Sequence, residues 1–234
     1  MAEPAADGDL GAARGRDGAR RPVLVLGSAS PARATLLRAA GITPIIWHST
    51  VDEDALIAAA GALSADPPAL TQMLATAKAR DVADRVRAGI IPGVPSATRV
   101  LVVGADSMLD FDGQVLGKAR TAQEVRERWA AMSGRRGVLV TGHTVIDLDS
   151  GRMVERAVST TIRFGRPDPV ELEAYIASGE PLAVAGSCTI DGLGGPFIEG
   201  IEGDHSNVIG LALPTLRALL ADLGVRWTDL WGAA

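Results

Sequence analysis

The sequence predicts an α/β fold built around one mixed β-sheet, and three observations lead to this prediction. Apolar residues make up 47% of the 234 residues, which is enough to fill the core of one large domain. In the first half of the chain, short apolar runs alternate with helical patterns, as in sheets with parallel strands. In the second half, residues 137–165 alternate between apolar and polar side chains, which is typical of an antiparallel hairpin.

The elements of the first half are apolar runs that end at glycine or proline. Residues 22–27 form a β-branched run, and residues 100–106 form a continuous apolar run, as expected for a strand covered on both faces. Pro31 stands at the first position of a helix that ends at Gly41. The other expected elements are a strand over 43–50, helices over 54–64 and 69–88, and a loop over 89–99.

The second half begins with an Asp-Gly turn at residues 112–113. A helix over 121–134 follows, capped by Thr121 with Glu124 three residues later. The turn of the long hairpin falls at residues 149–151. The remaining expected elements are a helix over 168–180, a glycine-rich loop over 186–210 and a closing helix over 214–224.

Composition limits the organisation and the partners of the chain. Residues 1–20 carry no apolar stretch and are interpreted as a flexible leader, whereas residues 21–234 contain no linker and form a single domain. No apolar run is long enough for a membrane span, so we expect a cytoplasmic protein. The net charge of −5 argues against a stable nucleic-acid partner. The single cysteine, Cys188, excludes an intramolecular disulfide and is expected to be buried.

The stretch “GSASPAR” at residues 27–33 joins the first strand to the first helix. Ser28 and Ser30 are residue types that cap helices, and a helix start also exposes backbone N–H groups that attract anions. Arg33 lies in the first helical turn, where the helix dipole favours an acidic residue. The residues alone therefore leave two interpretations open, an ordinary helix cap and a site for an anionic ligand.

Further charged residues follow expected strands. Asp106 comes directly after a buried strand, where it can hold a divalent metal or activate water, or simply form a turn. Lys118 follows a glycine and can meet a phosphate or remain a solvated surface lysine. Glu53 belongs to the acidic run 51–54, which is more often a helix start than a metal site. Lys78 interrupts an apolar helical pattern, a position from which lysine usually extends to water.

Several common catalytic motifs are absent from the sequence. There is no G-x-x-x-x-G-K-[ST] loop, no G-x-S-x-G elbow and no histidine-rich metal motif. The three histidines, His48, His143 and His205, are scattered and argue against a histidine-based nucleophilic triad. Carboxylates and cations without a nucleophile suit the hydrolysis of a phosphate ester or anhydride with Mg²⁺.

Nine stretches of the sequence carry a resemblance to a known family through their residues and their order: “LGSASPAR”, “VDE”, “ATAKA”, “VVGADS”, “DGQVLGKA”, “MSGR”, “TGH”, “YIASGEP” and “AGSCTIDGLGGPFIEGIEGDHSNVIGLALP”. In this order they resemble the Maf family of nucleoside triphosphate pyrophosphatases over about residues 22–224. The resemblance implies the fold of inosine triphosphate pyrophosphatase, an elongated mixed β-sheet flanked by helices, with two lobes and a cleft. It also implies cleavage of a nucleotide between its α- and β-phosphates.

The resemblance also implies roles for individual residues. Asp106 would be the catalytic base and would hold a divalent cation, Mg²⁺ or Mn²⁺, together with Glu53. A homodimer is a family expectation, and a non-catalytic, nucleotide-binding regulator of septum formation and cell division is the alternative function. The nucleoside triphosphate would be bound by Ser28, Ser30, Arg33, Lys78, Lys118 and the position of Asp191.

Three positions depart from the family pattern. Ala32 stands where one of two consecutive arginines is usual, and Val184 stands where a lysine is usual. Asp191 replaces a substrate-facing glutamine, so a group that donates and accepts hydrogen bonds becomes one that only accepts. The usual preference for pyrimidine nucleotides is therefore not expected to carry over to this chain.

Overall fold

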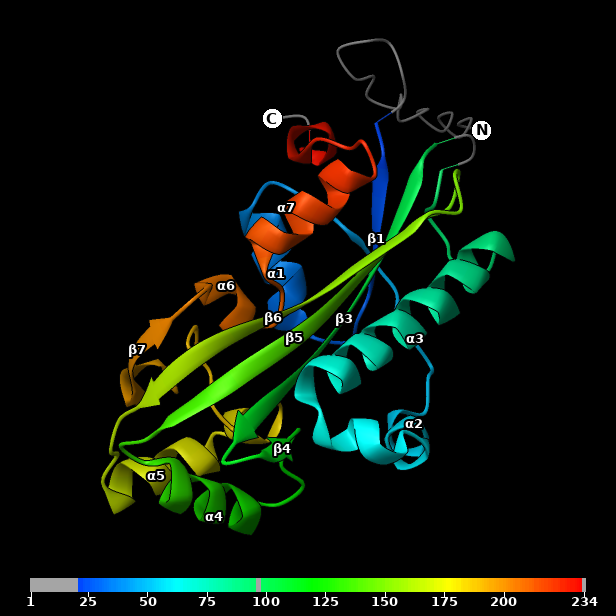
Figure 1. Cartoon of the computed structure of the whole chain (residues 1–234). Coiled ribbons are helices and arrows are strands. Elements are labelled where there is room, and N and C mark those ends of the chain that lie inside the picture. Colours follow the sequence, from blue (N-terminus) through cyan, green and yellow to red (C-terminus); the bar gives the residue numbers. More distant parts are fainter. Residues whose placement is uncertain (1–20, 96–97, 233–234) are drawn as a thin grey trace, which may run out of the picture.

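The computed structural model describes residues 21–95 and 98–232, so the expected leader over residues 1–20 lies outside the described part. The described chain is an α/β protein with a seven-stranded mixed sheet, in the order β2-β1-β3-β5-β6-β7 with β4 beside β3. Figure 1 shows an elongated arrangement, with the long strands running between helices gathered at two ends. The mixed sheet predicted from the sequence is confirmed.

Three long antiparallel strands form the centre of the sheet, and β1 adds the parallel part. Strand β1 (Val23–Gly27) lies parallel to both β2 and β3. The strand expected over 43–50 is reduced to the two residues of β2, because it pairs only with β1. The other strands are β3 (Val100–Phe111), β4 (Gln114–Leu116), β5 (Arg136–Asp147), β6 (Met153–Phe164) and β7 (Ile198–Glu202), with β2 at Ile45–Ile46.

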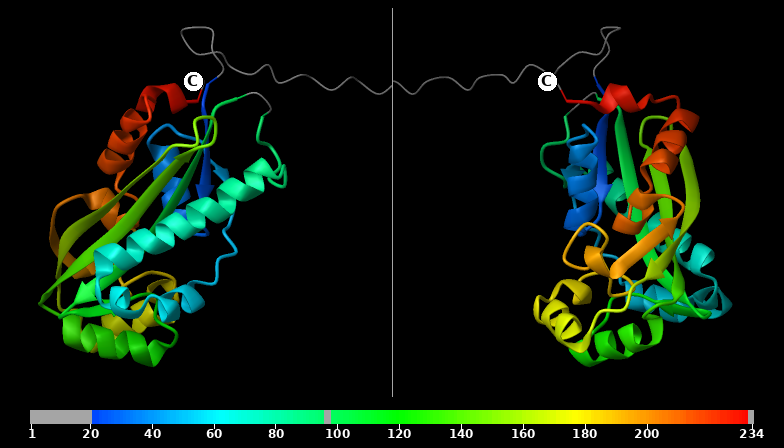
Figure 2. Two further views of the ribbon diagram at one scale, coloured as in Figure 1. Left: turned by 45° about the vertical axis from the view of Figure 1, so that its right-hand side comes forward. Right: turned by 90° about the vertical axis from the view of Figure 1, so that its left-hand side faces the viewer.

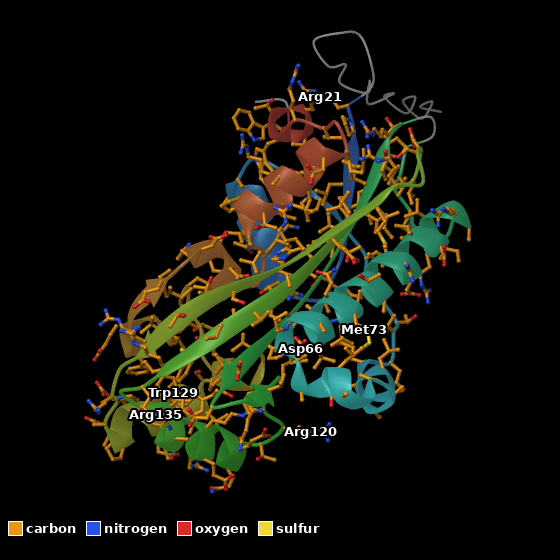
Figure 3. All side chains as sticks on the ribbon, viewed as in Figure 1. Arg21, Asp66, Met73, Arg120, Trp129 and Arg135 are labelled. Carbon is orange, nitrogen blue, oxygen red and sulfur yellow. The ribbon has the colours of Figure 1, made fainter. Side chains whose placement is uncertain are left out.

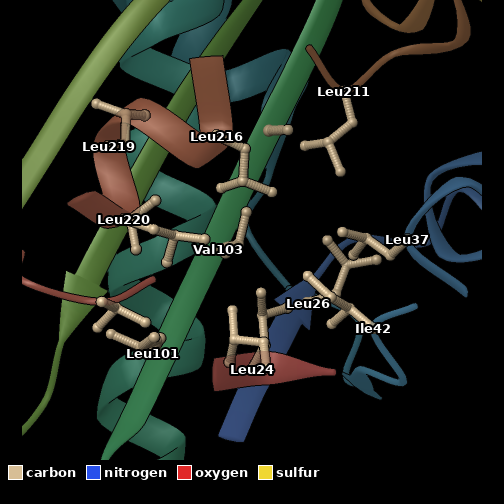
Figure 4. Close-up of a cluster of buried hydrophobic side chains, with 14 of the residues drawn as sticks. Leu24, Leu26, Leu37, Ile42, Leu101, Val103, Leu211, Leu216, Leu219 and Leu220 are labelled. Atoms are coloured by element: carbon tan, nitrogen blue, oxygen red, sulfur yellow. The ribbon is translucent and has the colours of Figure 1, made fainter. Parts of the chain in front are cut away.

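Helices cover both faces of the sheet at its upper end. Helices α1 (Pro31–Ala39) and α7 (Leu213–Asp222) pack on one face through the aliphatic cluster shown in Figure 4, which includes Leu26, Leu37 and Leu216. Helix α3 (Pro67–Arg87) packs on the other face, against a second aliphatic cluster. Leucine, valine and alanine therefore fill this part of the core, as the scarcity of aromatic residues predicts.

The backbone of α3 lies directly on the strands, and two glycines permit this approach. A Cβ atom at Gly104 of β3 would lie 2.2 Å from the carbonyl oxygen of Ala75. A Cβ atom at Gly142 of β5 would lie 2.4 Å from the carbonyl oxygen of Thr71. Both distances are far shorter than any real carbon–oxygen contact, so side chains at these positions would push α3 away from the sheet.

The lower end of the molecule has a different core, which is built around Trp129. Helices α4 (Ala122–Met132) and α5 (Pro169–Ala177) lie here, as Figures 1 and 2 show. The indole of Trp129 makes edge-to-face contacts with Phe164, Tyr175 and Phe197, at ring-centroid distances of 5.8, 6.3 and 6.0 Å. Cys188 is buried in the same cluster, as predicted.

Further sequence predictions about individual elements need correction. The helix expected over 54–64 is divided into α2 (Glu53–Ala59) and a 3₁₀ helix (Gly61–Ala65), because Gly61 adopts a φ of 56°. Strand β7 and helix α6 (His205–Ile209) lie within the glycine-rich stretch expected to be a loop, so His205 begins a helix. The hydroxyl of Thr121 caps α4 as predicted, but the Glu124 carboxylate accepts from the N–H of Arg120 and not from that of Thr121. Short 3₁₀ helices not predicted lie at Glu180–Leu182, Gly195–Phe197 and Trp227–Leu230.

Candidate active site

The candidate site lies where one edge of β3 has no neighbouring strand. Strand β1 pairs with β3 as far as Gly104, and β4 pairs with β3 only from Leu109 onward. Among the described residues, the segment Ala105–Met108 therefore lacks a strand partner on this edge, and we call it the edge gap. The backbone groups of a strand edge are free to bind a ligand in such a gap.

Asp106 lies inside the edge gap and not at the end of its strand, contrary to the sequence prediction. It pairs with Gly142 of β5, and this antiparallel pairing continues as far as Asp110. The strand that ends here is the neighbour, β1, whose last residue is Gly27. Asp106 therefore lies on a strand edge that is left unpaired because the adjacent strand has ended, which a single sequence does not reveal.

Lys78 of α3 lies between two carboxylates on one face of β3. Its Nζ is 2.6 Å from Oδ1 of Asp106 and 2.9 Å from Oε2 of Glu53, the first residue of α2. Lys78 is only 9% exposed, so the expectation that it extends to water is wrong. The close approach of α3 to Gly104 holds the lysine against the strand, where the carboxylates replace water.

Asp106 is itself buried and incompletely bonded. Its Oδ1 accepts from Lys78, but its Oδ2 is buried and has no hydrogen-bond partner in the described part of the chain. Burial raises the pKa of Asp106 above its ordinary value, although the charges of Lys78 and Arg33 act in the opposite direction. A buried carboxylate oxygen with no partner is suited to a ligand that brings a positive charge or a proton.

Arg33 of α1 lies on the opposite face of β3 and is held by neutral oxygen atoms. Its Nε donates to the carbonyl oxygen of Gly210 at 2.6 Å, and its Nη1 and Nη2 donate to the hydroxyls of Ser28 and Ser107, each at 2.9 Å. Within the described residues no carboxylate forms a salt bridge with it. Burial lowers the pKa of Arg33, with Asp106 and Glu53 opposing this effect, but an arginine remains charged.

The two serines of “GSASPAR” have different surroundings. Ser28 is buried, and its hydroxyl accepts from the N–H of Ser30 and from Arg33, so it orients the arginine and does not cap α1. Ser30 occupies the N-cap position, but its side chain makes no cap hydrogen bond, so the cap interpretation of its hydroxyl is wrong. A free hydroxyl at a helix start beside a buried arginine is suited to an anion.

Two hydroxyl residues that the sequence analysis did not single out complete the Arg33 side. Ser107 Oγ lies 2.9 Å from Thr141 Oγ1, which reaches the carbonyl oxygen of Asn207 at 3.4 Å. The amide of Asn207 donates to Leu139, Val158 and Thr160 and so ties α6 to β5 and β6. Ser107 and Thr141 belong to the stretches “VVGADS” and “TGH”, so the sequence signal was present although the residues were not named.

Lys118 follows a residue that lies next to the edge gap, but its side chain does not contact Asp106. It is exposed and forms an isolated bridge with Ala185. A Cβ atom on the preceding Gly117 would lie 3.2 Å from the sulfur of Met108, which is two residues beyond Asp106 on the same face of β3. Lys118 is thus placed near the edge gap without a direct contact.

Asp191 stands apart from the other predicted site residues. It is exposed, on a loop whose backbone is held by the carboxylate of Glu180 through the N–H groups of Leu193 and Gly194. Within the described part of the chain it makes no side-chain hydrogen bond.

Two surface cavities, of about 320 and 250 Å³, are not lined by Asp106, Lys78 or Arg33. The first is lined by Ile46, Trp47, His48, Thr50 and Arg85. The second is lined by Phe111, Gln114, Leu116, Glu124, Glu127, Arg128, Ala131 and Met132.

Glu53 and Asp106 provide the donor set that Mg²⁺ or Mn²⁺ prefers, although it is small. No cluster of three histidine, cysteine or acidic side chains able to hold a metal occurs in residues 21–95 and 98–232. Mg²⁺ nevertheless commonly keeps several waters and is held by one or two carboxylates together with substrate phosphates. The unpartnered Oδ2 of Asp106 is consistent with such a site, so these two carboxylates fit a divalent cation.

Fold and site together define an α/β protein with a buried carboxylate and two buried cations around a strand edge, an arrangement suited to an anionic ligand. The family model described as “Maf-like protein” matches residues 23–223. The chain therefore belongs to the Maf-like protein family, as its motifs indicated. A helix long and apolar enough to cross a membrane does not occur among the described residues.

The chain is also similar to curated proteins over most of its length. It is 52% identical over 211 residues to the nucleoside triphosphate pyrophosphatase of Streptomyces coelicolor, which covers 90% of this chain and 95% of the relative. It is 50% identical over 212 residues to the protein of the same name from Nocardia farcinica, covering 89% and 96% of the two chains. The relative of that name from Rhodococcus opacus is 49% identical over 214 residues, covering 90% and 96%.

Proposed function

We propose that this protein is a nucleoside triphosphate pyrophosphatase, a hydrolase that cleaves the α–β phosphoanhydride to give a nucleoside monophosphate and pyrophosphate. The names of relatives about half identical to the chain support this activity. The observation that carries the mechanism is the unpartnered Oδ2 of buried Asp106, next to Lys78 and on the strand edge.

Asp106 acts as the base in this proposal. Its Oδ2 is free to accept a proton from a water molecule directed at the α-phosphorus. Burial raises the pKa of the carboxyl group, which makes it a stronger base than an exposed aspartate. Lys78 holds Oδ1, and so keeps the carboxylate in one orientation.

The cations of the site stabilise negative charge on the phosphates. Arg33 carries a positive charge that no carboxylate in the described part of the chain neutralises by direct contact, and the Ser30 hydroxyl beside it donates to phosphate oxygen. Lys78 and Lys118 supply further positive charge, and Asp191 faces the substrate. A divalent cation bound by Glu53 and Asp106 would neutralise phosphate oxygens when the substrate is present.

Other features belong to the same proposal. The enzyme is cytoplasmic, residues 21–234 form one catalytic domain behind a flexible leader over residues 1–20, and the protein is a homodimer. Asp191, which accepts but does not donate hydrogen bonds when ionised, selects a base different from that chosen by a glutamine. Sedimentation velocity of the purified protein would test the dimer directly.

Pyrophosphate release across a panel of normal and modified nucleoside triphosphates, with and without Mg²⁺, tests the function. We expect Mg²⁺-dependent release of one pyrophosphate and one monophosphate from at least one member of the panel. Saturable binding of nucleotides without turnover of any of them would contradict the proposed pyrophosphatase activity and favour a non-catalytic regulator of cell division.

A further inference from the structure

The segment after β4 carries two exposed cations on one side. Lys118 and Arg120 are exposed, whereas Ala119 between them is buried against the lower core. The exposed side chains of Lys118 and Arg120 flank the buried Ala119, so both cations point away from the lower core. Figure 3 labels Arg120 next to α2, which identifies the element that this side faces.

The first turn of α2 connects this segment to the buried site. Glu53 bonds to Lys78, and the next residue, Asp54, faces Arg120 at 3.4 and 3.5 Å. Helix α2 is held in place because Leu56 and Ile57 pack against a small cluster that includes Met108 of the edge gap. The guanidinium of Arg120 therefore contacts Asp54, the residue that directly follows Glu53 of the candidate site.

The charges of the buried site leave a requirement for further cations. Lys78 and Arg33 are balanced by Asp106 and Glu53, so these four side chains carry no net charge. A triphosphate brings several negative charges, which need additional positive groups where its outer phosphates lie. Lys118 and Arg120 are exposed cations beside the candidate site, and Arg120 faces the residue that follows Glu53.

The present partner of Arg120 is easily displaced. The side chains of Arg120 and Asp54 are 80% and 84% exposed, and their separation is at the long end for an ion pair. Exposed pairs of this kind contribute little to stability. A phosphate offers the same guanidinium a doubly charged, bidentate acceptor.

We propose that Arg120 is a further substrate-binding residue, which contacts the β- and γ-phosphates and is held near the site by Asp54 in the free protein. This inference rests on the proposed function, because it assigns Arg120 to the leaving pyrophosphate. On substrate binding, the guanidinium exchanges the Asp54 carboxylate for phosphate oxygens. The monophosphate product lacks these phosphates and makes no contact with Arg120.

The test compares Arg120→Gln with Arg126→Gln, a matched loss of an exposed arginine that is paired with Glu173 on neighbouring α5. We expect Arg120→Gln to raise the KM for the triphosphate, and the inhibition constant of pyrophosphate, about tenfold. The kcat and the inhibition constant of the monophosphate stay unchanged, and Arg120→Lys recovers part of the loss. Equal KM values in the two glutamine variants, or equal weakening of monophosphate and pyrophosphate, would overturn the proposal.

A double-mutant cycle with Asp54→Asn tests the exchange itself. Calorimetry measures the affinity for pyrophosphate in Asp54→Asn, in Arg120→Gln and in the variant that carries both changes. We expect the affinity to rise about twofold in Asp54→Asn, because Arg120 is released from its partner, and we expect no such rise when Arg120→Gln is also present. The same gain in the double variant would show that Arg120 is not involved. Calorimetry measures pyrophosphate binding without turnover, so it tests the role of Arg120 independently of catalysis. A wild-type protein that releases no pyrophosphate would refute the proposed function, and the effect of Arg120 on pyrophosphate binding could still be measured.

Discussion

The two buried cations of the site have contrasting environments. On one face of β3, Lys78 contacts the carboxylates of Asp106 and Glu53. On the other face, Arg33 contacts two hydroxyls and a carbonyl oxygen, and no carboxylate of residues 21–95 and 98–232. Both cations are less than a tenth exposed, so burial alone does not explain the difference.

The chemistry of the two side chains explains why each environment is tolerated. A lysine buried without a counter-ion readily loses its proton, whereas an arginine stays charged in neutral surroundings. Lys78 is therefore a partner that orients Asp106, and Arg33 keeps a positive charge that an anionic ligand can neutralise. The comparison separates the side of the site that prepares the base from the side that attracts the substrate.

The largest expected effect comes from removing the base on the Lys78 side. Asp106→Asn should lower kcat by a factor of about 10² to 10⁴, because general-base catalysis is lost while the shape of the side chain is kept. Pyrophosphate release measures the effect, and calorimetry should still detect nucleotide binding. Asp84→Asn, which alters an exposed residue of α3, is the control, and wild-type kcat in Asp106→Asn would refute the mechanism.

The next prediction concerns the contact between β3 and α3, the helix that carries Lys78. Gly104→Ala should lower the free energy of unfolding by about 3 kcal/mol or more, because its Cβ would collide with the backbone of α3 at Ala75. Urea unfolding measures this change. Gly232→Ala serves as the control because a Cβ there meets nothing within 4 Å. An unchanged midpoint for Gly104→Ala would show that α3 is not held against the sheet.

A third prediction concerns His143, which lies on the Arg33 side. Its Nε2 accepts from the N–H of Ala212, and burial lowers its pKa from 6.5 to about 4, with Arg33 adding to the effect. In the unfolded chain the imidazole takes up a proton near pH 6.5, so the unfolded state binds more protons between pH 6.5 and 4. The free energy of unfolding should therefore fall with decreasing pH in this window, by up to about 3 kcal/mol.

The pH dependence is checked with chemical unfolding at several pH values. His143→Gln should lose most of this pH dependence, whereas His205→Gln, which alters an exposed histidine, should keep it. The same slope in wild type and His143→Gln would show that another group is responsible.

The smallest effect tests the attraction of an anion by Arg33. Arg33→Met should raise the inhibition constant of inorganic pyrophosphate about 10- to 30-fold, because a charge-assisted contact is lost. Arg38→Met, at an exposed position of the same helix, should leave the constant unchanged. Equal inhibition of both variants would place the anion on the Lys78 side alone.

Much of the architecture could be predicted because it depends on local patterns. The apolar runs of β1 and β3, the proline at the start of α1 and the long alternation of β5 and β6 each indicate their element directly. The prediction failed for β2, whose length depends on its neighbour, and for β7 and α6, which are short elements within a glycine-rich stretch. Family membership was confirmed because it rests on the order of many motifs.

The sequence by itself determined the residue types of the site, the mixed sheet and the family. Only the tertiary structure decided that one edge of β3 is unpaired at Asp106, that Lys78 is buried between carboxylates and that the Ser28 hydroxyl accepts from Arg33. The physical reason is that burial and pairing depend on contacts between residues far apart in the chain.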